Sequence, residues 1–427
     1  MNLQSFPSPY RADPQIASLG AKIGDPVRAA DFPGAILRYR NDRWAATVGL
    51  DGLSDEDWVR HFARFEPLPD NMPTPLALRY HGHQFRVYNP DIGDGRGFLF
   101  AQMRDGAGRL MDLGTKGSGT TPYSRDGDGR LTLKGAVREI LATEMLEALG
   151  VETSKTFSVI ETGEALMRGD EPSPTRSAVL VRLSHSHIRI GAFQRLAFEG
   201  DEAQMAALVH YALEKLYGVF PGDNPPVQLM NLAVERLADL AASYMVAGFV
   251  HGVLNSDNIN ITGESFDYGP WRFTELWDPG FTAAYFDHQG LYAFGRQAEA
   301  IHWDAAQLAI SLRLIAEAPP LVAALERFPA LYQEALIRRF LWRLGVPSKG
   351  EAEDRALIEA SERRMIDERI PIATFFREAR PHIPDCTMLI DEVEAIWAPI
   401  AEADDWAPLH AKIASIRAYG AALRTAA

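Results

Sequence analysis

The spacing of apolar residues follows two different patterns along this chain, and the pattern changes near residue 200. Before that point, short β-prone runs stand between glycine-rich turns, a pattern that predicts strands. Apolar residues spaced by three and four then predict one amphipathic helix over 134–149, which Gly150 ends. The first two predicted strands form a hairpin around the turn at 105–108. The four predicted strands are 98–103, 109–116, 156–161 and 178–183.

Beyond residue 200 the apolar spacing becomes helical. Residues 1–75 are rich in proline and predict an extension packed on the body, with a short helix at 55–65. We therefore expect three parts: the extension, a small sheet-rich lobe over 76–195 and a larger helical lobe over 196–427. This α+β division matches that of protein kinases, which at this point is an analogy. The predicted helices of the large lobe are 228–250, 298–316, 329–344, 351–368 and 389–402.

Composition narrows the class of protein. Hydrophobic residues make up 47% and charged residues 23%, as in ordinary globular proteins. The net charge of −14 argues against a broad nucleic-acid surface. Cys386 is the single cysteine, which excludes an internal disulfide and indicates a reducing compartment. No secretory signal and no run of about 20 apolar residues is present, so we expect a cytoplasmic protein that binds no membrane.

Two glycine segments can approach phosphate groups. Gly93-Asp-Gly95-Arg96-Gly lies just ahead of a predicted strand, although such a segment can also be an ordinary turn. Lys116 ends the next strand, where it can hold a phosphate or simply face solvent. A phosphate-binding lysine needs an orienting carboxylate from a packed helix, as in kinases. Glu139 is the expected partner, and Glu144 is the alternative.

The segment His251-Gly-Val-Leu-Asn-Ser-Asp-Asn258 follows the long helix and resembles the kinase catalytic loop H-R-D-x-x-x-x-N. Asp267 follows nine residues later, where kinases carry the metal-binding aspartate. Asn258 and Asp267 together offer the oxygen ligands that Mg²⁺ prefers. Val253 replaces the catalytic-loop aspartate and cannot accept a proton. Asp257 is the nearest replacement; the alternative is a turn residue that only shapes the loop.

Arg182 and Arg189 lie seven residues apart, on and just past a predicted strand. Arginine binds phosphate with two parallel hydrogen bonds, but each arginine can equally be a surface ion-pair partner. Two histidine pairs, at 81 and 83 and at 185 and 187, could each hold zinc. Neither pair has an obvious third ligand, so structural hydrogen bonding is the favoured interpretation.

From these motifs the chain is identified as resembling selenoprotein O, the YdiU family of kinase-like protein adenylyltransferases. The matching segments run in family order over about 76–310, and residues 310–427 match loosely. Many family members carry a cysteine or selenocysteine near the C-terminus, whereas this chain ends Ala-Leu-Arg-Thr-Ala-Ala, so the resemblance leaves redox control through that residue open for this chain. The segments are YHGHQF at 80–85, GDGRG at 93–97, KGSGTTPYSR at 116–125, GDGR at 127–130, VRLSHSH at 181–187, 251–258, FDYGP at 266–270, PGF at 279–281 and DHQG at 287–290.

The resemblance implies a kinase fold that binds ATP in a flipped orientation, with the γ-phosphate end buried. AMP then moves to a Ser, Thr or Tyr hydroxyl of a protein substrate, and self-modification is included among the expected reactions. Asn258 and Asp267 would hold Mg²⁺ or Mn²⁺, and Asp257 would accept the proton. Transfer of UMP in the presence of Mn²⁺ is implied for some bacterial members. The implied nucleotide contacts are Gly93, Gly95, Arg96, Lys116, Asp128, Gly129, Arg182, Arg189 and Asp267.

Two other functions compete with a metal-dependent protein adenylyltransferase. The first is a kinase-like phosphotransferase, which the loss of the aspartate at Val253 disfavours. The second is a non-catalytic pseudokinase scaffold that only binds nucleotide. The presence of Lys116, Glu139, Asn258 and Asp267 argues against a scaffold, because binding alone does not need a complete metal and phosphate set.

Overall fold

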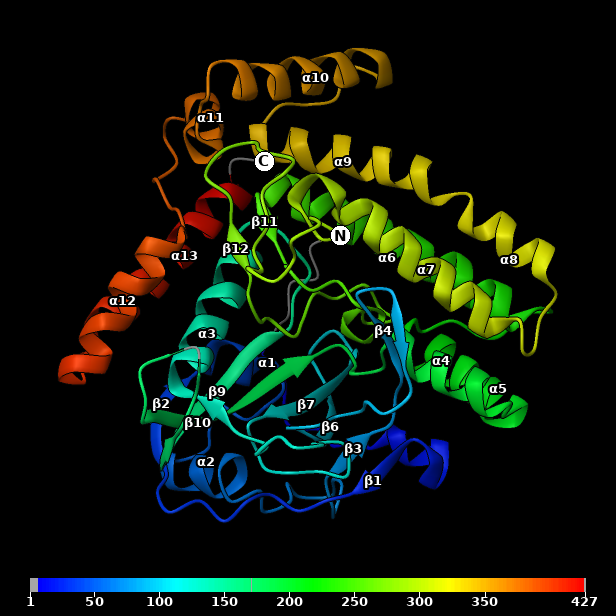
Figure 1. Cartoon of the computed structure of the whole chain (residues 1–427), viewed down its shortest axis with the longest axis vertical. Helices are drawn as coiled ribbons and strands as arrows, with labels where there is room; N and C mark the ends of the chain where they lie inside the picture. The colour runs from blue at the N-terminus through cyan, green and yellow to red at the C-terminus, as the bar shows by residue number, and fades with distance from the viewer. Residues whose placement is uncertain (1–6, 170, 426–427) are drawn as a thin grey trace.

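The computed structural model describes residues 7–169 and 171–425 (Figure 1). The first six residues, which belong to the stretch where no secretory signal was found, lie outside this range. So do the last two, which belong to the C-terminal sequence considered for redox control. No helix in the described part combines the length and the apolar character that a membrane crossing requires.

One antiparallel sheet organises the first half of the chain, with the strand order β1-β3-β6-β7-β10-β9-β2 and β8 paired to β10. The predicted hairpin is confirmed as β6 and β7, and the other two predicted strands are confirmed as longer strands, β9 and β10. The segment before residue 75 also supplies the two edge strands, β1 and β2, which its proline-rich sequence did not indicate. The strands are β1 (Gly24–Pro26), β2 (Ile36–Arg40), β3 (Leu76–Leu78), β6 (Leu99–Arg104), β7 (Leu110–Lys116), β8 (Leu131–Thr132), β9 (Lys155–Leu166) and β10 (Thr175–Ser184).

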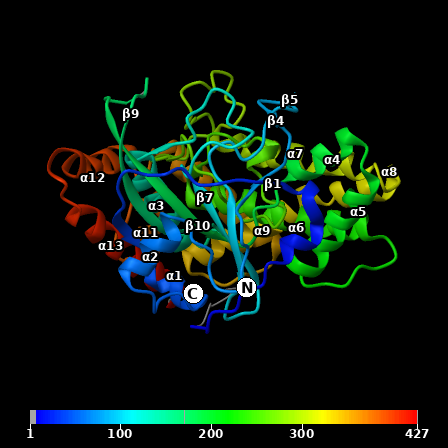
Figure 2. The same cartoon turned by 90° about the horizontal axis from the view of Figure 1, so that it is seen from below.

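Helix α3 (Leu133–Ala148) packs against β9 and β10 and matches the predicted helix to within a residue at each end. The hydroxyl of Thr132 accepts a hydrogen bond from the backbone of Gly135 and caps its first turn. Most residues of α3 are buried, because the sheet covers its inner face and helices α12 (Ile390–Ala403) and α13 (Ala407–Thr425) cover its outer face (Figures 1 and 2). The helix is therefore an internal helix rather than a surface helix.

Helices dominate the rest of the chain. The predicted helix 228–250 forms, but the prediction of its end is wrong: α6 stops at Ala247, because Gly248 takes a left-handed φ of 70°. Residues 249 and 250 instead form β11 (Phe249–Val250), which pairs with β12 (Arg272–Phe273). The other helices are α1 (Asp42–Thr47), α2 (Asp55–Phe62), α4 (Ile190–Glu199), α5 (Glu202–Tyr211), α6 (Pro225–Ala247), α7 (Gln297–Leu312), α8 (Ala318–Leu325), α9 (Phe328–Leu344), α10 (Glu351–Asp367) and α11 (Ile372–Ala379).

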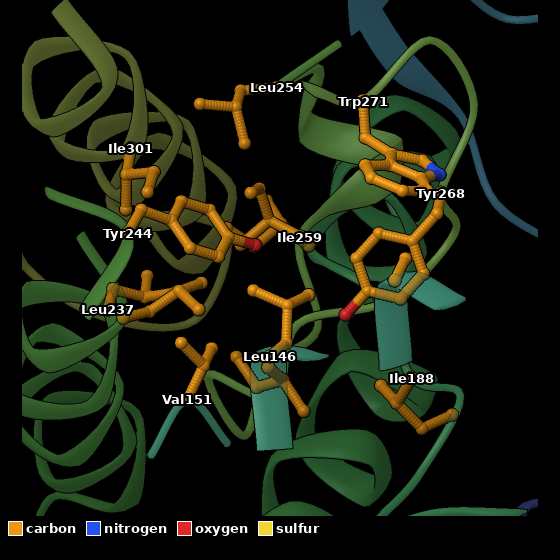
Figure 3. Close-up of a cluster of buried hydrophobic side chains, with 14 of the residues drawn as sticks. Leu146, Val151, Ile188, Leu237, Tyr244, Leu254, Ile259, Tyr268, Trp271 and Ile301 are labelled. Carbon is orange, nitrogen blue, oxygen red and sulfur yellow. The ribbon is translucent and has the colours of Figure 1, made fainter. Parts of the chain in front are cut away.

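A continuous hydrophobic core joins the sheet-rich and helical halves (Figure 3). Leu146 of α3 and Ile188, just after β10, belong to the same buried cluster as Leu237 of α6 and Ile301 of α7. Tyr268, between the two halves, is 4% exposed and belongs to this cluster. The α+β class predicted from the sequence, with a sheet-rich first half and a helical second half, is confirmed by this arrangement. The proposed boundary at residue 195 stays a prediction.

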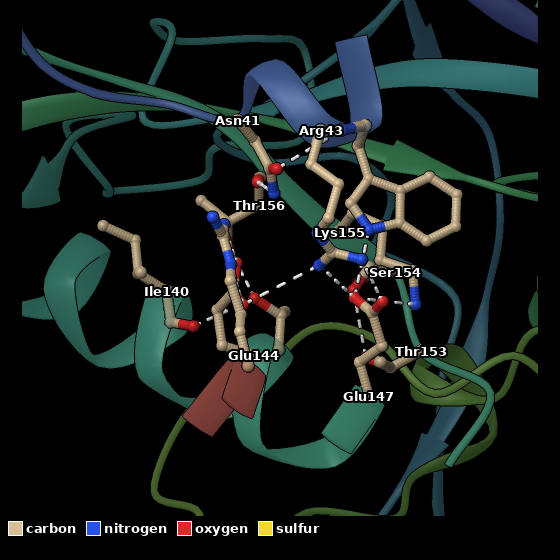
Figure 4. A network of polar contacts seen from close by, with 12 residues as sticks. Asn41, Arg43, Ile140, Glu144, Glu147, Thr153, Ser154, Lys155 and Thr156 are labelled. Atoms are coloured by element: carbon tan, nitrogen blue, oxygen red, sulfur yellow. Dashed lines mark hydrogen bonds and ion pairs between the residues drawn. The ribbon is translucent and has the colours of Figure 1, made fainter. Parts of the chain in front are cut away.

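Polar contacts fix α3 to the N-terminal segment (Figure 4). The carboxylate of Glu147 accepts hydrogen bonds from the Arg43 guanidinium at 2.9 Å and from the Trp44 indole at 3.0 Å. Lys155 Nζ lies 3.7 Å away. Burial raises the pKa of Glu147, but Lys155 and Arg43 outweigh it and lower this pKa to about 2. The ionised form is therefore stabilised by folding.

This pKa predicts a pH-dependent stability. Because the folded pKa lies below the ordinary value of 4.5, the contribution is complete above about pH 4.5 and is lost as the pH falls toward 2. Glu147→Gln should cost on the order of 3 kcal/mol of unfolding free energy at pH 7 and nearly as much at pH 5, and progressively less at pH 4 and pH 3. Urea unfolding at pH 7, 5, 4 and 3 measures the difference. A difference that stays constant across this range, or that the exposed control Glu334→Gln reproduces, would contradict the assignment.

Candidate nucleotide and metal site

The register of the sheet brings two of the predicted cations together. In the β7–β10 pair, Lys116 lies opposite Leu180, and Gly114 lies opposite Arg182. Residues two apart on a strand share a face, so Lys116 and Arg182 occupy diagonal positions on the same face. Both side chains are buried, with 5% exposed. Their charges must therefore be compensated by other parts of the protein.

Lys116 has two carboxylate partners. Its Nζ lies 2.8 Å from Glu139 Oε2 on α3 and 3.2 Å from Asp267 Oδ1, and it also donates to the carbonyl of Tyr268 at 3.1 Å. The alternative partner, Glu144, is engaged elsewhere, since it accepts hydrogen bonds from Tyr39 and Arg417. The lysine is thus held from a neighbouring helix and from the segment after the loop 251–258.

Arg189, the residue just before α4, provides a third buried cation beside Lys116 and Arg182. Its guanidinium lies 3.1 Å from Asp267 Oδ2 and 3.1 Å from Asp94 Oδ1, and it donates to the backbone carbonyl of Asp257 at 2.8 Å. Arg182 lies 3.4 Å from Asp267 Oδ1. Phe266 has the guanidinium groups of Arg182 and Arg189 5.3 and 4.7 Å from its ring centre. Three buried cations therefore converge on one carboxylate.

Asp267 is held in a demanding backbone conformation. Its φ is 65°, in the left-handed region that costs a residue other than glycine roughly 1 kcal/mol or more. Burial raises the pKa of its carboxyl, but Lys116, Arg182 and Arg189 outweigh burial and hold this pKa well below 3.8. Asp267 is accordingly ionised at neutral pH and can act as a hard oxygen ligand.

The loop 251–258 is fixed by contacts from both halves. His251 makes structural contacts. Its backbone N–H donates to Gln297 Oε1 at 3.0 Å, and its Nε2 lies 3.0 Å from the carbonyl of Phe266. The amide Nδ2 of Asn258 donates to the carbonyl of Val253 at 3.1 Å. That bond orients the side chain so that Oδ1 is the atom able to bind a cation. The short helix η3 (Ser256–Asn258) ends this loop.

Asp257 differs from Asp267 in its surroundings. It is 7% exposed, and its Oδ1 has no hydrogen-bond partner within residues 7–169 and 171–425. Burial raises the pKa of its carboxyl to about 6, with a further contribution from the charge of Asp267, and Arg189 opposes the rise only in part. A carboxyl with that pKa can accept a proton near neutral pH.

A cavity of about 660 Å³ joins these groups. Asp128 on its rim forms an ion pair with Arg168 at 2.8 Å. Asn258 is not among the residues that line this cavity, so of the two predicted metal ligands only Asp267 reaches its wall. The predicted site residues along the wall are Gly93, Gly95, Arg96, Lys116, Asp128, Gly129, Arg182, Arg189, Asp257 and Asp267.

The histidine pairs make protein contacts instead of forming a visible metal cluster. The backbone of His187 donates to Asp112 Oδ2 at 2.9 Å, and His83 Nδ1 lies 2.7 Å from Gln194 Nε2. Within the described residues, no group of three or more His, Cys, Asp or Glu side chains could hold a metal ion. These contacts agree with the structural interpretation of both pairs.

Several residues of the site were not singled out from the sequence. Asp94 stands inside the quoted glycine segment and pairs with Arg189, so its position beside the glycines was a usable signal. Tyr80 lies under the same guanidinium, with 4.5 Å from Arg189 Cζ to its ring centre. Tyr123 and Arg168 also line the cavity. Arg168 follows β9 at a position where nothing local in the sequence indicates a site.

The family model and the curated relatives point to the same family. The model of the family described as "Protein adenylyltransferase SelO" matches residues 9–383. A relative from Synechococcus elongatus named protein nucleotidyltransferase YdiU is 49% identical over 79% of this chain and 68% of its own length. A relative of the same name from Gloeobacter violaceus is 40% identical over 95% of this chain and 94% of its own length.

Solved structures with a similar backbone are far more distant. A rhoptry antigen kinase domain from Toxoplasma gondii is 11% identical and covers 68% of this chain and 84% of its own, at a TM-score of 0.29. A Toxoplasma gondii virulence factor with a protein-kinase fold and no enzymatic activity is 14% identical, covers 68% and 82%, and has a TM-score of 0.30. So distant a likeness says nothing of this chain's activity. The family match and the curated relatives, in contrast, confirm the resemblance and the enzyme class expected from the sequence: the chain belongs to the SelO family of protein adenylyltransferases.

Proposed function

We propose that this enzyme moves AMP from ATP to a Ser, Thr or Tyr hydroxyl of a protein, with the triphosphate tail bound by Lys116, Arg182 and Arg189. The supporting observation is the convergence of these three buried cations beside a cavity that Asp257 also lines. Fixed, buried cations suit a group whose negative charge grows as it leaves. In the flipped orientation that group is pyrophosphate, and the α-phosphorus faces the acceptor.

The reaction balances with one proton acceptor. The acceptor oxygen forms a bond to the α-phosphorus, the bond from that phosphorus to the bridging oxygen breaks, and pyrophosphate leaves with the electron pair. The hydroxyl proton passes to Asp257, whose pKa of about 6 keeps it mostly ionised at neutral pH yet basic enough to help. Lys116 and the two arginines stabilise the charge that collects on pyrophosphate.

Asn258 and Asp267 are the proposed ligands of Mg²⁺ or Mn²⁺. Their chemistry fits a hard cation, because Asp267 is ionised and the amide of Asn258 is oriented by its bond to Val253. The ion supplies neutralisation of phosphate charge when it is bound. Phosphate oxygens compete with Asp267 for the same three cations, so nucleotide binding would loosen the ion pairs of Asp267.

Two finer details rest on the family resemblance, namely transfer of UMP with Mn²⁺ and self-modification. The proposed absence of nucleic-acid and membrane partners and the proposed cytoplasmic location rest instead on the net charge, the single cysteine and the lack of a long apolar run. A kinase-like phosphotransferase remains the second candidate, because the Lys116–Glu139 pair is the arrangement that kinases use. Val253, an apolar residue where kinases carry the base, disfavours that candidate.

The position of the transferred phosphate distinguishes the two candidates. Label in the α-phosphate of ATP should appear on protein, and label in the γ-phosphate should not. Intact mass should rise by ~329 Da, the mass of one transferred AMP group. The measurement uses the purified chain with Mg²⁺ or Mn²⁺, alone and with lysate proteins. Exclusive transfer of the γ-label would establish the phosphotransferase instead.

Replacement of Asp267 tests the metal assignment. Asp267→Ala leaves the neutral amide of Asn258 as the remaining proposed ligand, so transfer should fall by roughly a hundredfold or more, as expected for loss of an electrostatic group in the site. Raising the Mg²⁺ concentration should restore little activity. Asp278→Ala, which removes an exposed carboxylate from the following segment, is the control and should retain activity. Full activity of the Asp267 variant in EDTA-treated buffer would disprove the assignment.

Two variants of Asp257 separate chemistry from binding. Asp257→Ala should lose transfer by roughly 10²–10⁴-fold, the usual contribution of a positioned base. Its ATP affinity should stay similar or rise, because a carboxylate repels a polyanion. Lys116→Ala and Arg182→Ala should instead weaken both binding and transfer. Calorimetry with ATP and intact-mass assays measure the two effects.

The nearly isosteric Asp257→Asn decides between a base and a turn residue. It keeps the shape of the loop but cannot accept a proton at neutral pH. We expect it to be as inactive as Asp257→Ala. An active Asp257→Asn enzyme would remove Asp257 from the mechanism and leave the nucleotide site in place.

A further inference from the structure

The C-terminal helix α13 contacts the outer face of α3 at backbone distance. A Cβ atom built on Gly420 would lie 2.8 Å from Ala148 Cα and 2.9 Å from Ala148 Cβ, so the contact accepts no side chain at residue 420. Both views place α13 beside α3 (Figures 1 and 2). Helix α13 lies beyond residues 9–383, the part of the chain that the family model matches. The contact therefore lies outside the part of the chain that the family model covers.

An ion pair joins the two helices at the same place, between the buried Glu144 and the half-buried Arg417. The guanidinium of Arg417 donates to Glu144 through Nε at 2.9 Å and Nη2 at 2.6 Å. Tyr39 Oη donates to Glu144 Oε1 at 2.8 Å, and Arg43 lies 3.8 Å from Glu144. The side chain of Glu144 is 3% exposed. A two-pronged arginine contact of this kind fixes orientation as well as distance.

The opposite side of α3 carries the carboxylate that orients Lys116. Glu139 and Glu144 are five residues apart, which places them roughly 140° apart around a helix of 3.6 residues per turn. Thr143, between them, bonds to Thr156 of β9 at 3.1 Å and ties the helix to the sheet. Helix α3 is thus held between the Lys116–Glu139 pair on its inner side and the Arg417–Glu144 pair on its outer side.

We infer that Arg417 is a positioning residue for the phosphate site: through Glu144 it sets the position of α3, and through Glu139 it sets the position of the Lys116 ammonium group. The inference rests on the proposed function of Lys116 as a phosphate ligand. A packed helix shifts as a rigid element, so a change on its outer face moves its inner face as well. Arg417 contacts no residue of the cavity wall itself within the described contacts.

The matched variants are Arg417→Met and Lys412→Met. Both remove one ion pair of α13, but Lys412 binds Glu392 of α12 and not α3. Arg417→Met should weaken ATP affinity roughly 2- to 30-fold, the range expected for coupling through a packed element. Adenosine lacks phosphates, so its affinity should stay constant. The ratio of the two dissociation constants, measured by competition binding on the full chain, should therefore change with Arg417 and not with Lys412.

A merely structural role gives a different result. If Arg417→Met loosens the whole protein, ATP and adenosine lose affinity together and the ratio stays constant, which would overturn the inference. An unchanged ATP affinity would overturn it as well. Arg417→Lys, which keeps a charge near Glu144, should restore part of the ratio. The double variant Glu144→Gln/Arg417→Met leaves no buried carboxylate without its cation, so it folds more readily and should still show the altered ratio.

Gly420→Ala tests the same contact without changing a charge. Alanine favours a helix over glycine by about 1 kcal/mol, but its methyl group would lie within 3 Å of Ala148. The variant should shift the ATP-to-adenosine ratio in the same direction as Arg417→Met, and an unchanged ratio would contradict the coupling. None of these measurements needs AMP transfer. A failure of the α-label experiment would therefore leave this test interpretable, and the reverse also holds.

Discussion

The ionised carboxylate of Asp267, buried among three cations, is the interaction on which the rest of the site depends. Lys116 and Arg182 come from the sheet, Arg189 from the start of α4, and Asp267 from the segment that follows the loop 251–258. Removing such charges from water costs several kcal/mol each unless they are paired. Glu139 and Asp94 complete the compensation, so three positive groups face three negative ones. A bound triphosphate adds negative charge to a balanced cluster, which is a physical reason for the enzyme to require a divalent cation.

Helix α3 connects this cluster of charges with distant parts of the chain. Its Glu139 belongs to the cluster, its Glu147 is fixed by the N-terminal segment, and its Glu144 is bound by α13. The two outer carboxylates meet residues from opposite ends of the sequence. A short helix with charged contacts on both faces cannot shift at one face without also moving the contacts at the other. Contacts from residues 39–44 and from α13 thus meet on the helix whose Glu139 holds Lys116.

The parts of this structure that were predictable are those with a local physical cause. Regular apolar spacing predicted α3 and most long helices, and the four turn residues 105–108 predicted the β6–β7 hairpin. The edge strand β1 spans three residues and includes Pro26, so its pairing with β3 depends on distant neighbours. The end of α6 could have been found, because Gly248 is the residue type that stops helices. The contact of Glu144 with Arg417 joins residues 273 positions apart, and no local pattern indicates it.

Two carboxylates that lie near each other in the sequence, Asp257 and Asp267, acquire opposite chemistry from their neighbours. Asp267 faces three cations that lower its pKa, whereas Asp257 is buried with Oδ1 unpartnered and has a pKa of about 6. A group that stays ionised suits a metal ion, and a group that titrates near neutrality suits a proton. The cations that separate the two pKa values are the proposed anchors of the triphosphate tail. In the proposed mechanism these anchors set which phosphorus faces Asp257, and the apolar Val253 is compatible with it because the proposed proton acceptor lies beside that phosphorus.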